Sequence, residues 1–592
     1  MSDRETRLTR AHLVFAGIVL LALGMRVSNL GARPLDDREA SQALWAADGS
    51  PAASAFWPHE NTAAASAGYQ AMTWLAFQLT GGGNATARLW PALLGTLLVL
   101  PPWLLRRRFG TVGALAASFL LAISPTLVAA SRTAGGTSAA LVAVAFGVAA
   151  LLLVLDGDWG LRTASSVFAA AVALGLTAGP DFYLGLLGLV PAAGLMLATT
   201  PTPWAPQAWK EIRSRLPAAI GVGVLGAIAL AVLVGFLPRG LTSLAEGLRL
   251  WVAGWIGPGD LHALTPLVIL VVYEPLVLVF GLVGIAAAIR GRDSVFIGGA
   301  WWALLALVVA VLYPGRTGAS AAWCTIPLAC LAGVGLAREA ERFRRLANPW
   351  QAAGVAALLL VLFAYAGLQL SAYASGVGPG ASPLVPEARL AVAAGAIIVA
   401  SLAVILIGLG WSWGIALSGV AAAGALILLL LTVSSGWRLL FYQERLGAGE
   451  LWTSSNPTYG IPRLAATVTS LSRSARGVSN ELPIAIDDPS PPPSLLWALR
   501  AFPRFLTNDV DTPESPPILL TRIPENPPQR TADYLGQSIA ISEGWDFAGP
   551  LPPNFLVWWW RRRLPAVEDK WLLLVRADIA TLGESPASSA QP

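Results

Sequence analysis

The stretch TSAALVAVAFGVAALLLVLD, at residues 137–156, carries no charge before its last residue. A helix that crosses about 30 Å of hydrocarbon needs about 20 mainly apolar residues, because its backbone amides must bond within the segment. This stretch therefore predicts a membrane-spanning helix. The composition agrees, since 55% of the 592 residues are apolar and only 12% are charged, which is about half the charged share of soluble domains. A mean hydropathy of +0.63 also argues against a water-soluble protein.

Similar apolar stretches recur along the first three quarters of the chain. With residues 137–156 they make about thirteen candidate spans, which predicts a polytopic α-helical membrane protein. The others lie near residues 11–30, 86–105, 112–130, 163–178, 182–198, 217–237, 266–289, 295–313, 319–337, 351–370, 389–410 and 413–433. We find no repeated half and no glycine- or proline-broken pair of spans, the feature that marks a binding site at the midplane of many transporters.

The basic loops predict the orientation, because cationic loops stay on the cytoplasmic side of a membrane. The basic clusters at 106–108, 210–215 and 338–345 fall on the same side as residues 1–10 if the N-terminus is cytoplasmic. We therefore expect a multi-pass protein of the cell (plasma) membrane. An odd number of spans then places the chain after about residue 434 outside the cytoplasm.

The C-terminal part differs in character, because its apolar runs shrink to strand length and prolines become frequent. Residues 434–582 are expected to form an extracytoplasmic α/β domain, and residues 583–592 a disordered tail. Strands are expected at 483–487, 517–521 and 570–579, and helices at 461–476 and 494–501.

Two outer loops, at 31–85 and 238–265, are longer than turns need to be, and long loops often carry function. The first contains LDDREASQALWAADG at 35–49, which places Asp36, Asp37 and Glu39 where the chain leaves the first span. Carboxylates at that depth are within reach of a lipid headgroup. The alternative is an acidic helix start, because Asp and Glu are favoured in the first turn of a helix.

Four further charges are expected on the same outer face. Arg88 at the mouth of the second span could hold a phosphate, or could extend to the lipid headgroups as arginines near helix ends do. Arg132 in SRTAGG, Arg316 in YPGRTG and Asp181 in AGPDFY lie in outward loops, where each alone would be an ordinary loop charge. Their shared side with Asp36 indicates a site, since arginine suits phosphate binding.

Other chemistries receive little support from the sequence. Cys324 and Cys330 lie within one apolar run, which is typical of buried thiols, so we expect no metal site and no redox site. The glycines at 81–83 lack the strand-to-helix context of a nucleotide loop. We expect no nucleic-acid partner.

These motifs together resemble the GT-C superfamily of membrane glycosyltransferases, which includes protein O-mannosyltransferases and lipid A aminoarabinose transferases. The resemblance covers about residues 11–340 and rests on LDDREA, on GYQAMTWLAFQLTGGGNATARLWPALLGTLLVL at 68–100, on RRRFG at 106–110 and on ISPTLVAASRTAGG at 123–136. Residues 341–433 are then additional transmembrane helices. The tail, with SNPTYG at 455–460, SLLWALRAF at 494–502 and WWWRRRLP at 558–565, resembles the flippase-activity-associated family of archaeal-type surface N-glycosylation.

The resemblance implies an enzyme that takes a sugar from a polyprenyl-phosphate donor on the extracytoplasmic face, with inversion at the anomeric carbon. A carboxylate of the first outer loop would be the general base, here Asp37 as the first choice, Glu39 as the second and Asp36 as the third. Arg132, Arg88 and Arg316 would bind the donor phosphate, with Asp181 as a second acid. The family usually has adjacent Asp and Glu at this point, whereas Arg38 directly precedes Glu39 here.

The acceptor stays open between protein, lipid and glycan, and the donor sugar and any divalent metal stay unassigned. Two other functions remain as alternatives. The many spans are compatible with a transporter or flippase of lipid-linked saccharide, and the altered acidic motif with a non-catalytic partner in surface glycan assembly.

Overall fold

The computed structural model describes residues 9–47, 65–200, 206–237, 239–375, 386–442, 449–506, 515–523, 533–545, 547, 549–564 and 567–579. The chain is a polytopic helical membrane protein. Within these residues ten helices are long and apolar enough to span a membrane, and two bent helix pairs raise the number to as many as twelve. The thirteenth expected span corresponds to α9 (Leu161–Leu176), an apolar helix of 16 residues, which is shorter than the helices counted above.

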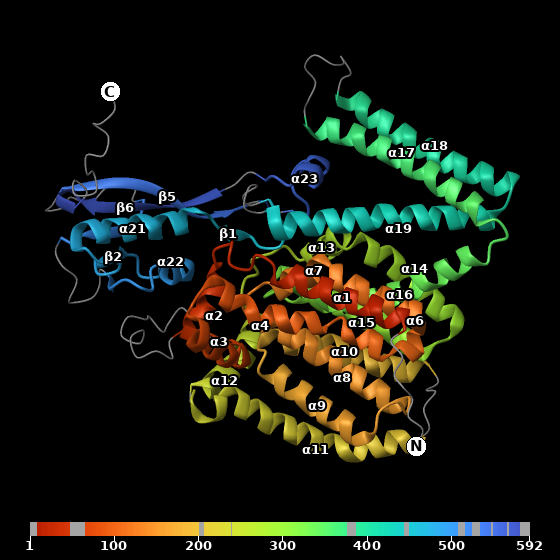
Figure 1. Ribbon diagram of the computed structural model, residues 1–592, viewed down its shortest axis with the longest axis horizontal. Helices are drawn as coiled ribbons and strands as arrows, with labels where there is room; N and C mark the ends of the chain where they lie inside the picture. Colours follow the sequence, from red (N-terminus) through yellow and green to blue (C-terminus); the bar gives the residue numbers. More distant parts are fainter. Residues whose placement is uncertain are drawn as a thin grey trace.

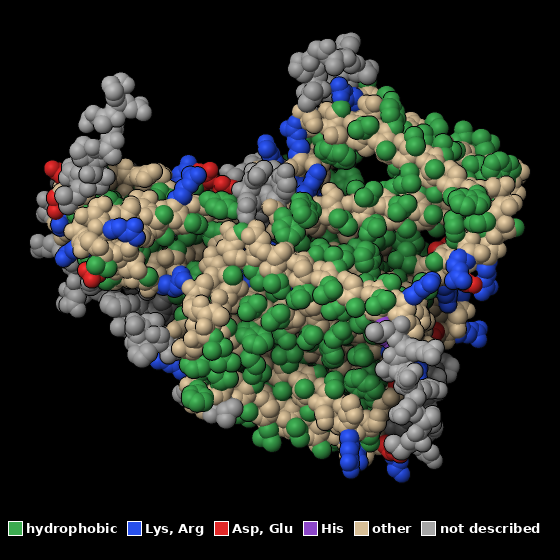
Figure 2. Space-filling model, viewed as in Figure 1, with side chains coloured by type: hydrophobic (Ala, Val, Ile, Leu, Met, Phe, Trp, Pro, Cys, Tyr) green, Lys and Arg blue, Asp and Glu red, His purple; other side chains and the backbone are tan. Residues whose placement is uncertain are grey.

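The helices of the membrane region lie side by side, with their axes running along the long dimension of Figure 1. Their bounds are α1 Arg10–Val27, α4 Asn84–Leu97 with α5 Leu100–Leu104, α8 Thr137–Leu155, α10 Pro180–Thr199, α11 Pro206–Ala231, α15 Ser294–Leu312, α16 Ala322–Arg344, α17 Pro349–Ser375, α18 Pro386–Gly410 and α19 Trp413–Trp437. Apolar side chains cover the middle of the flank seen in Figure 2, and charged ones gather toward its ends.

Two spans are broken at a proline. Helix α6 (Arg106–Ile123) turns by 56° into α7 (Pro125–Ser131), and α13 (Thr265–Tyr273) turns by 96° into α14 (Pro275–Gly291). Proline lacks an N–H and fits the first turn of a helix, so the second helix of each pair starts at its proline, Pro125 or Pro275. This differs from the expectation that no span is broken, because each long apolar run had been interpreted as one straight helix.

Two buried charged side chains form hydrogen bonds with the two helix ends at the α6–α7 break. Arg26 of α1, which is fully buried, donates to the backbone oxygens of Leu121 at 3.0 Å and Ala122 at 3.1 Å, the end of α6. Glu274, between α13 and α14, accepts from the backbone N–H of Thr126 at 3.0 Å and from the Ser124 hydroxyl. A cation at a helix C-terminus and an anion at an N-terminus each oppose the local end of the helix dipole. The break is therefore held by matched charges within the bundle.

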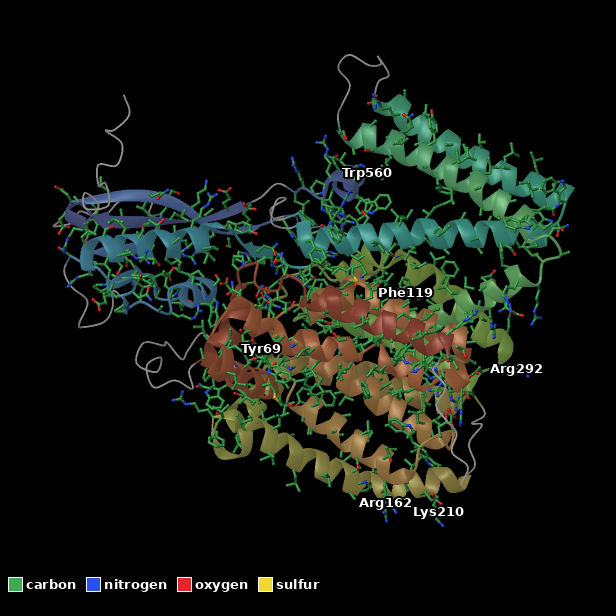
Figure 3. All side chains as sticks on the ribbon, in the orientation of Figure 1. Tyr69, Phe119, Arg162, Lys210, Arg292 and Trp560 are labelled. Carbon is green, nitrogen blue, oxygen red and sulfur yellow. The ribbon has the colours of Figure 1, made fainter. Side chains whose placement is uncertain are left out.

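The helices between the spans gather at one end of the bundle. There α2 (Asp37–Ala47) lies nearest the C-terminal domain, and α3 (Ala67–Thr80) and α12 (Gly240–Ala253) follow below it in Figure 1. Arg162, Lys210 and Arg292 lie toward the other end, far from Tyr69 of α3 (Figure 3).

The C-terminal part forms a mixed six-stranded sheet in the order β1-β5-β6-β4-β2-β3. Strand β2 pairs in parallel with β3 and β4, whereas the other pairings are antiparallel. The strands are β1 Ser455–Pro457, β2 Ile484–Asp487, β3 Arg504–Leu506, β4 Ile518–Arg522, β5 Tyr534–Gly544 and β6 Val567–Arg576, and the helices are α21 Gly460–Arg476, α22 Pro493–Ala498 and α23 Phe555–Arg561.

The expected strands and helices of the tail all form, but β5, its longest strand, was not expected. Its sequence YLGQSIAISEG contains two glycines and several polar residues, so its apolar signal is weak. Residues 583–592, which are expected to be a disordered tail, lie outside the described residues.

The outer loop and the tail share one hydrophobic core. Leu35, Ala40 and Leu44 from the start of α2 are buried in the same cluster as Leu495 and Trp497 of α22. Residues more than 400 positions apart in sequence therefore pack as one unit at this end of the bundle.

Candidate active site

Helix α2 begins with a reciprocal pair of side-chain hydrogen bonds. The Asp36 carboxylate accepts from the backbone N–H of Glu39 at 2.8 Å, and the Glu39 carboxylate accepts from the backbone N–H of Asp36 at 3.2 Å. This is a capping box, in which two otherwise unpaired N–H groups at a helix start are satisfied by side chains three residues apart. Two of the three acids in LDDREA therefore shape the helix that carries them.

Glu39 is fully buried and bonds to Arg88 of α4 through both carboxylate oxygens, at 2.8 and 2.5 Å. Its Oε1 also accepts from the backbone N–H of Ala134 at 2.8 Å. Burial alone would raise the pKa of Glu39, but the charge and hydrogen bonds of Arg88 lower it below its usual value. Glu39 is thus held ionised with every strong acceptor position in use.

Arg88 is equally well satisfied. Besides its two bonds to Glu39, it donates to the backbone oxygens of Leu30 at 2.9 Å, Arg33 at 2.8 Å and Pro34 at 2.9 Å. An arginine has five N–H donors, and these five hydrogen bonds use them. Arg88 therefore holds the first outer loop against α4.

Asp37 turns toward the tail. Its Oδ1 accepts from the backbone N–H of Ser494 at 3.0 Å and from the Ser494 hydroxyl at 2.6 Å, at the start of α22. Arg38, the next residue, points outward and pairs with Asp260 at 2.5 Å. Adjacent residues of one helical turn thus serve three different neighbours.

Asp36 keeps acid–base capacity. Within the described part of the chain its carboxylate accepts only the hydrogen bond from the backbone N–H of Glu39, so its second oxygen has no partner there. Burial, and next the negative charge of Glu39, raises the pKa of Asp36 to about 6, although Arg33 and Arg88 act in the opposite direction. A carboxylate with this pKa is ionised at neutral pH and is a stronger base than an ordinary aspartate.

A pocket of about 50 Å³ opens beside this loop. That is room for a phosphate-sized group, since a single water needs about 10–15 Å³ on this measure. One wall comes from the α1–α2 connection, another from α4 and the end of α7, and the third from η3 (Arg438–Tyr442) and the segment after it. The lining residues are Asn29, Leu30, Ala32, Arg33, Arg88, Ala129, Arg132, Thr133, Leu439, Leu440, Phe441 and Trp452.

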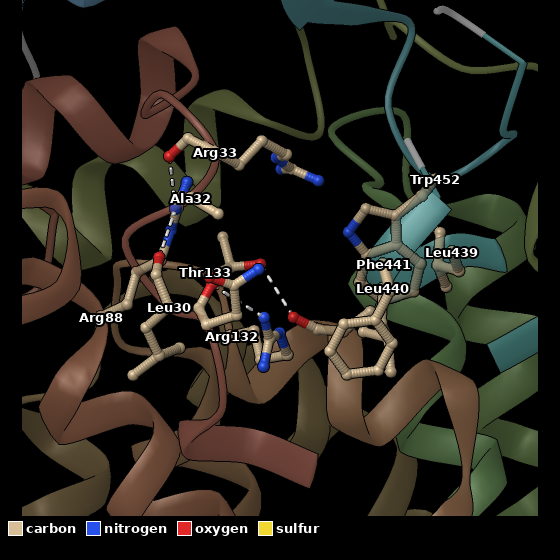
Figure 4. Close-up of a pocket in the computed structure, with 12 residues that line it drawn as sticks. Leu30, Ala32, Arg33, Arg88, Arg132, Thr133, Leu439, Leu440, Phe441 and Trp452 are labelled. Atoms are coloured by element: carbon tan, nitrogen blue, oxygen red, sulfur yellow. Dashed lines mark hydrogen bonds between the residues drawn. The ribbon is translucent and has the colours of Figure 1, made fainter. Parts of the chain in front are cut away.

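The polar lining of this pocket is cationic. Figure 4 shows Arg33 extending across it toward Trp452, with Arg132 on the floor near Phe441. The Arg132 guanidinium lies 5.3 Å from the centre of the Phe441 ring. Two guanidinium groups around one opening favour an anion over a neutral or cationic ligand.

Arg132 is also anchored by the end of α1. It donates to the backbone oxygens of Met25 at 3.0 Å, Arg26 at 3.3 Å and Ser28 at 2.6 Å through one nitrogen, and to that of Asn29 at 3.4 Å through another. Burial, and next the charges of Arg88 and Arg33, lowers the pKa of Arg132 to about 10. It stays charged at neutral pH, and a bound anion would offset its electrostatic repulsion with Arg33 and Arg88.

Two other candidates from the sequence lie outside this pocket. Asp181, at the start of α10, accepts a hydrogen bond from the Thr137 hydroxyl. Arg316 is buried and donates to the backbone oxygens of Leu261 at 2.6 Å and Val311 at 3.1 Å. The structure thus brings together Asp36, Glu39, Arg88 and Arg132, and leaves Asp181 and Arg316 apart from the pocket.

Three lining residues with charged or aromatic side chains were not anticipated. Arg33 lies three residues before Asp36 and could have been found from its place in the same loop. Phe441 lies at the C-terminal end of the last span and Trp452 follows it in sequence, so no local pattern connects them to residue 33. Among the described residues no group of three or more His, Cys, Asp or Glu side chains is placed to hold a metal ion.

The chain matches no protein-family model and no curated protein. Its structure is similar to that of ArnT from Cupriavidus metallidurans bound to undecaprenyl phosphate, with a TM-score of 0.53 and 15% identity over 86% of this chain and 92% of that one. The chain shares the ArnT fold. The apo form of ArnT gives a TM-score of 0.51 with 17% identity, over 84% of this chain and 86% of that one.

The likeness to ArnT is a likeness of fold. At these identities the comparison with ArnT shows the arrangement of helices and tail, and it transfers no residue role. The archaeal oligosaccharyltransferase AglB from Archaeoglobus fulgidus gives a TM-score of 0.47 with 13% identity, which is too low to establish a shared fold.

Proposed function

We propose that this chain is a membrane glycosyltransferase that transfers a sugar from a polyprenyl-phosphate donor to an acceptor on the extracytoplasmic face. The observation that carries the proposal is that Asp36, a base with a raised pKa, interacts electrostatically with Arg33, which lines a pocket together with Arg132. The ArnT fold supports it, since the ArnT structure holds undecaprenyl phosphate.

Asp36 is our choice for the general base among the three acids of LDDREA. Glu39 is committed to Arg88, and a carboxylate with four hydrogen bonds and a lowered pKa is a poor proton acceptor. Asp37 faces the tail through Ser494. Asp36 alone combines an unpartnered oxygen, within the described chain, with a pKa near the working pH.

The reaction then proceeds by one displacement. The acceptor hydroxyl attacks the anomeric carbon and gives its proton to Asp36, while the bond between that carbon and the phosphate oxygen breaks and the sugar inverts. The polyprenyl phosphate leaves with the negative charge, which Arg33 and Arg132 would stabilise. Asp181 stays a candidate for a second acid that orients the sugar. We assign Arg88 a structural role, and Arg316 no role at the phosphate.

We propose the orientation that the basic loops predict. Arg162, Lys210 and Arg292 lie at the end of the bundle opposite the pocket (Figure 3), and cationic ends favour the cytoplasm. The pocket and the sheet would then face outward, where lipid-linked sugars are used.

The test is transfer of radiolabelled sugar by the purified protein from a panel of polyprenyl-phosphate donors. Asp36→Asn should lower the rate about 100- to 10,000-fold, the usual share of a general base, without unfolding the protein, because asparagine can still cap α2. Wild-type kcat/KM should fall as the pH drops below about 6, because protonated Asp36 cannot accept a proton. Full activity of Asp36→Asn would refute the assignment.

A lipid-linked saccharide flippase is the second candidate. It is favoured by the two broken spans, which meet where Glu274 bonds to Ser124 and Thr126, because discontinuous helices often surround transported substrates. Movement of labelled lipid-linked sugar across vesicles by Asp36→Asn and wild type alike, without transfer, would favour it over the enzyme.

A further inference from the structure

The short helix α22 of the tail contacts both elements that carry the candidate site. It meets α2 through the two hydrogen bonds from Ser494 to Asp37. Within the described chain Asp37 has no other hydrogen-bond partner. This contact lies one residue from Asp36, at the point where α2 starts.

Trp497 of the same helix, and Arg500 just beyond its end, bind the start of α4 and the turn before it. The Trp497 indole N–H donates to the Asn84 side-chain oxygen at 2.8 Å, and Arg500 donates to the backbone oxygen of Gly82 at 2.5 Å. The Arg500 guanidinium stacks 3.9 Å above the Trp497 ring. Asn84 in turn donates to the backbone oxygen of Arg33 at 3.5 Å. The chain from α22 therefore reaches the loop that carries Asp36 from two sides.

Hydrophobic packing also holds α22 against α2. Leu495 and Trp497 are buried with Leu35 and Ala40, which flank the first turn of α2. A helix start is the part that frays most easily, since its first N–H groups lack partners within the helix. The contact with Ser494 restrains that turn from outside, beyond what the capping box provides from within.

We propose that α22 positions the catalytic base, with Ser494 as a positioning residue that fixes the first turn of α2 and so the direction of the free Asp36 oxygen. This rests on the proposed function of Asp36. The tail then contributes to the rate of the chemical step and little to donor binding, because no residue of α22 lines the pocket with Arg33 and Arg132.

The experiment compares Ser494→Ala with the conservative Ser494→Thr in the full-length protein. As a matched control, Ser470→Ala removes an exposed serine hydroxyl of α21 that bonds only within its own helix, to Thr467. Two quantities are measured: kcat and KM for transfer, and hydrogen exchange of the amides of residues 37–41. Exchange needs no activity, so it separates the two proposals.

We expect Ser494→Ala to lower kcat about 10- to 100-fold, the scale of a small misplacement of a catalytic group, with an unchanged donor KM and faster exchange at 37–41. Ser494→Thr and Ser470→Ala should match the wild type. Unchanged exchange in Ser494→Ala would overturn the positioning role, whatever happens to kcat. Faster exchange in a protein that never transfers sugar would support the coupling and overturn the proposed reaction.

Asp37→Asn distinguishes positioning from direct catalysis by Asp37. Asparagine keeps an oxygen that can accept both hydrogen bonds from Ser494, so the positioning proposal expects a loss of kcat of less than about tenfold. A loss as large as that of Asp36→Asn would make Asp37 the base and overturn the proposal.

Discussion

Two buried arginine–glutamate pairs lie in this protein, and they are built differently. Arg88 and Glu39 are joined by two short hydrogen bonds, and all five Arg88 donors are used. Arg562 meets Glu450 at 3.4 Å and Ser435 at 3.3 Å, and its Nε has no partner in the described structure. The first pair fixes a loop, whereas the second joins the end of the tail to the membrane region.

The looser pair is held by aromatic rings as well as by these two longer hydrogen bonds. The Arg562 guanidinium lies 4.6 Å from the Trp558 ring centre and 5.0 Å from that of Tyr273. Tyr273 also donates its hydroxyl to Glu450. A desolvated cation on an aromatic face gains about 2 kcal/mol. This interaction is less directional than a bidentate hydrogen bond. We infer that substitutions in the first pair destabilise the protein more than substitutions in the second pair.

The largest effect is expected from Arg88→Ala. It leaves Glu39 charged and unpaired in a buried position, a change that typically costs 3–5 kcal/mol, so about that loss of unfolding free energy is expected. Denaturant unfolding in detergent measures it. The control is Arg249→Ala, which breaks an exposed pair with Glu246 and should leave stability unchanged. A loss no greater than that of the control would contradict the account of Arg88.

Arg562→Ala should cost less, about 1–3 kcal/mol, because Tyr273 still donates to Glu450 and burial already raises the pKa of that glutamate toward its neutral form. The same unfolding measurement applies, with the exposed neighbour Arg563→Ala as its control. If Arg562→Ala destabilised the protein more than Arg88→Ala, the proposed contrast between the pairs would be inverted.

Lysine substitutions sharpen the contrast further. Lysine offers three donors on a point charge and cannot reproduce a five-donor fork. Arg88→Lys should therefore retain only part of the stability lost in Arg88→Ala, whereas Arg562→Lys should approach the wild type, because an ammonium can still lie over the rings. Equal losses at both sites, measured by unfolding, would show that donor count does not distinguish them.

The smallest effect is a difference in pH dependence. The pKa of Glu39 is lowered, so its contribution to stability is present above its ordinary value of 4.5 and is lost as the pH falls through the lower folded value. The pKa of Glu450 is raised by burial, so its contribution is complete below 4.5 and is lost as the pH rises through the higher folded value. The ion-pair coupling is a separate quantity, because a protonated Glu450 no longer attracts Arg562 by charge. Double-mutant cycles should show Glu450–Arg562 coupling fading as the pH falls through the raised pKa of Glu450, while Glu39–Arg88 coupling persists.

The sequence predicts the membrane class and most spans because the length of an apolar run is a local property. It does not predict the breaks, since Pro125 and Pro275 stand inside apolar runs long enough to be one helix. The spacing of Asp36 and Glu39 does carry a readable signal, because an acid followed three residues later by glutamate is a capping pattern. The partner of Asp37 lies 457 residues further along the chain, where no local pattern could reveal it.

The pocket illustrates the same division. Arg33 and Arg132 lie near recognisable motifs, but their ring partners Phe441 and Trp452 follow the last span. Charge types and helix lengths are set locally, whereas which acid stays free for chemistry depends on contacts between distant segments. Asp36, ranked last of the three acids from sequence, becomes first once the partners of the other two are known.

Arg26 also has a consequence for biosynthesis. Its partners Leu121 and Ser131 are 95 and 105 residues further along the chain, so they do not yet exist when α1 leaves the ribosome. At about 5–20 residues per second, the arginine waits about 5–20 s for them. During that interval α1 carries an uncompensated charge, which favours its staying beside the insertion machinery or near the headgroups until α6 and α7 arrive.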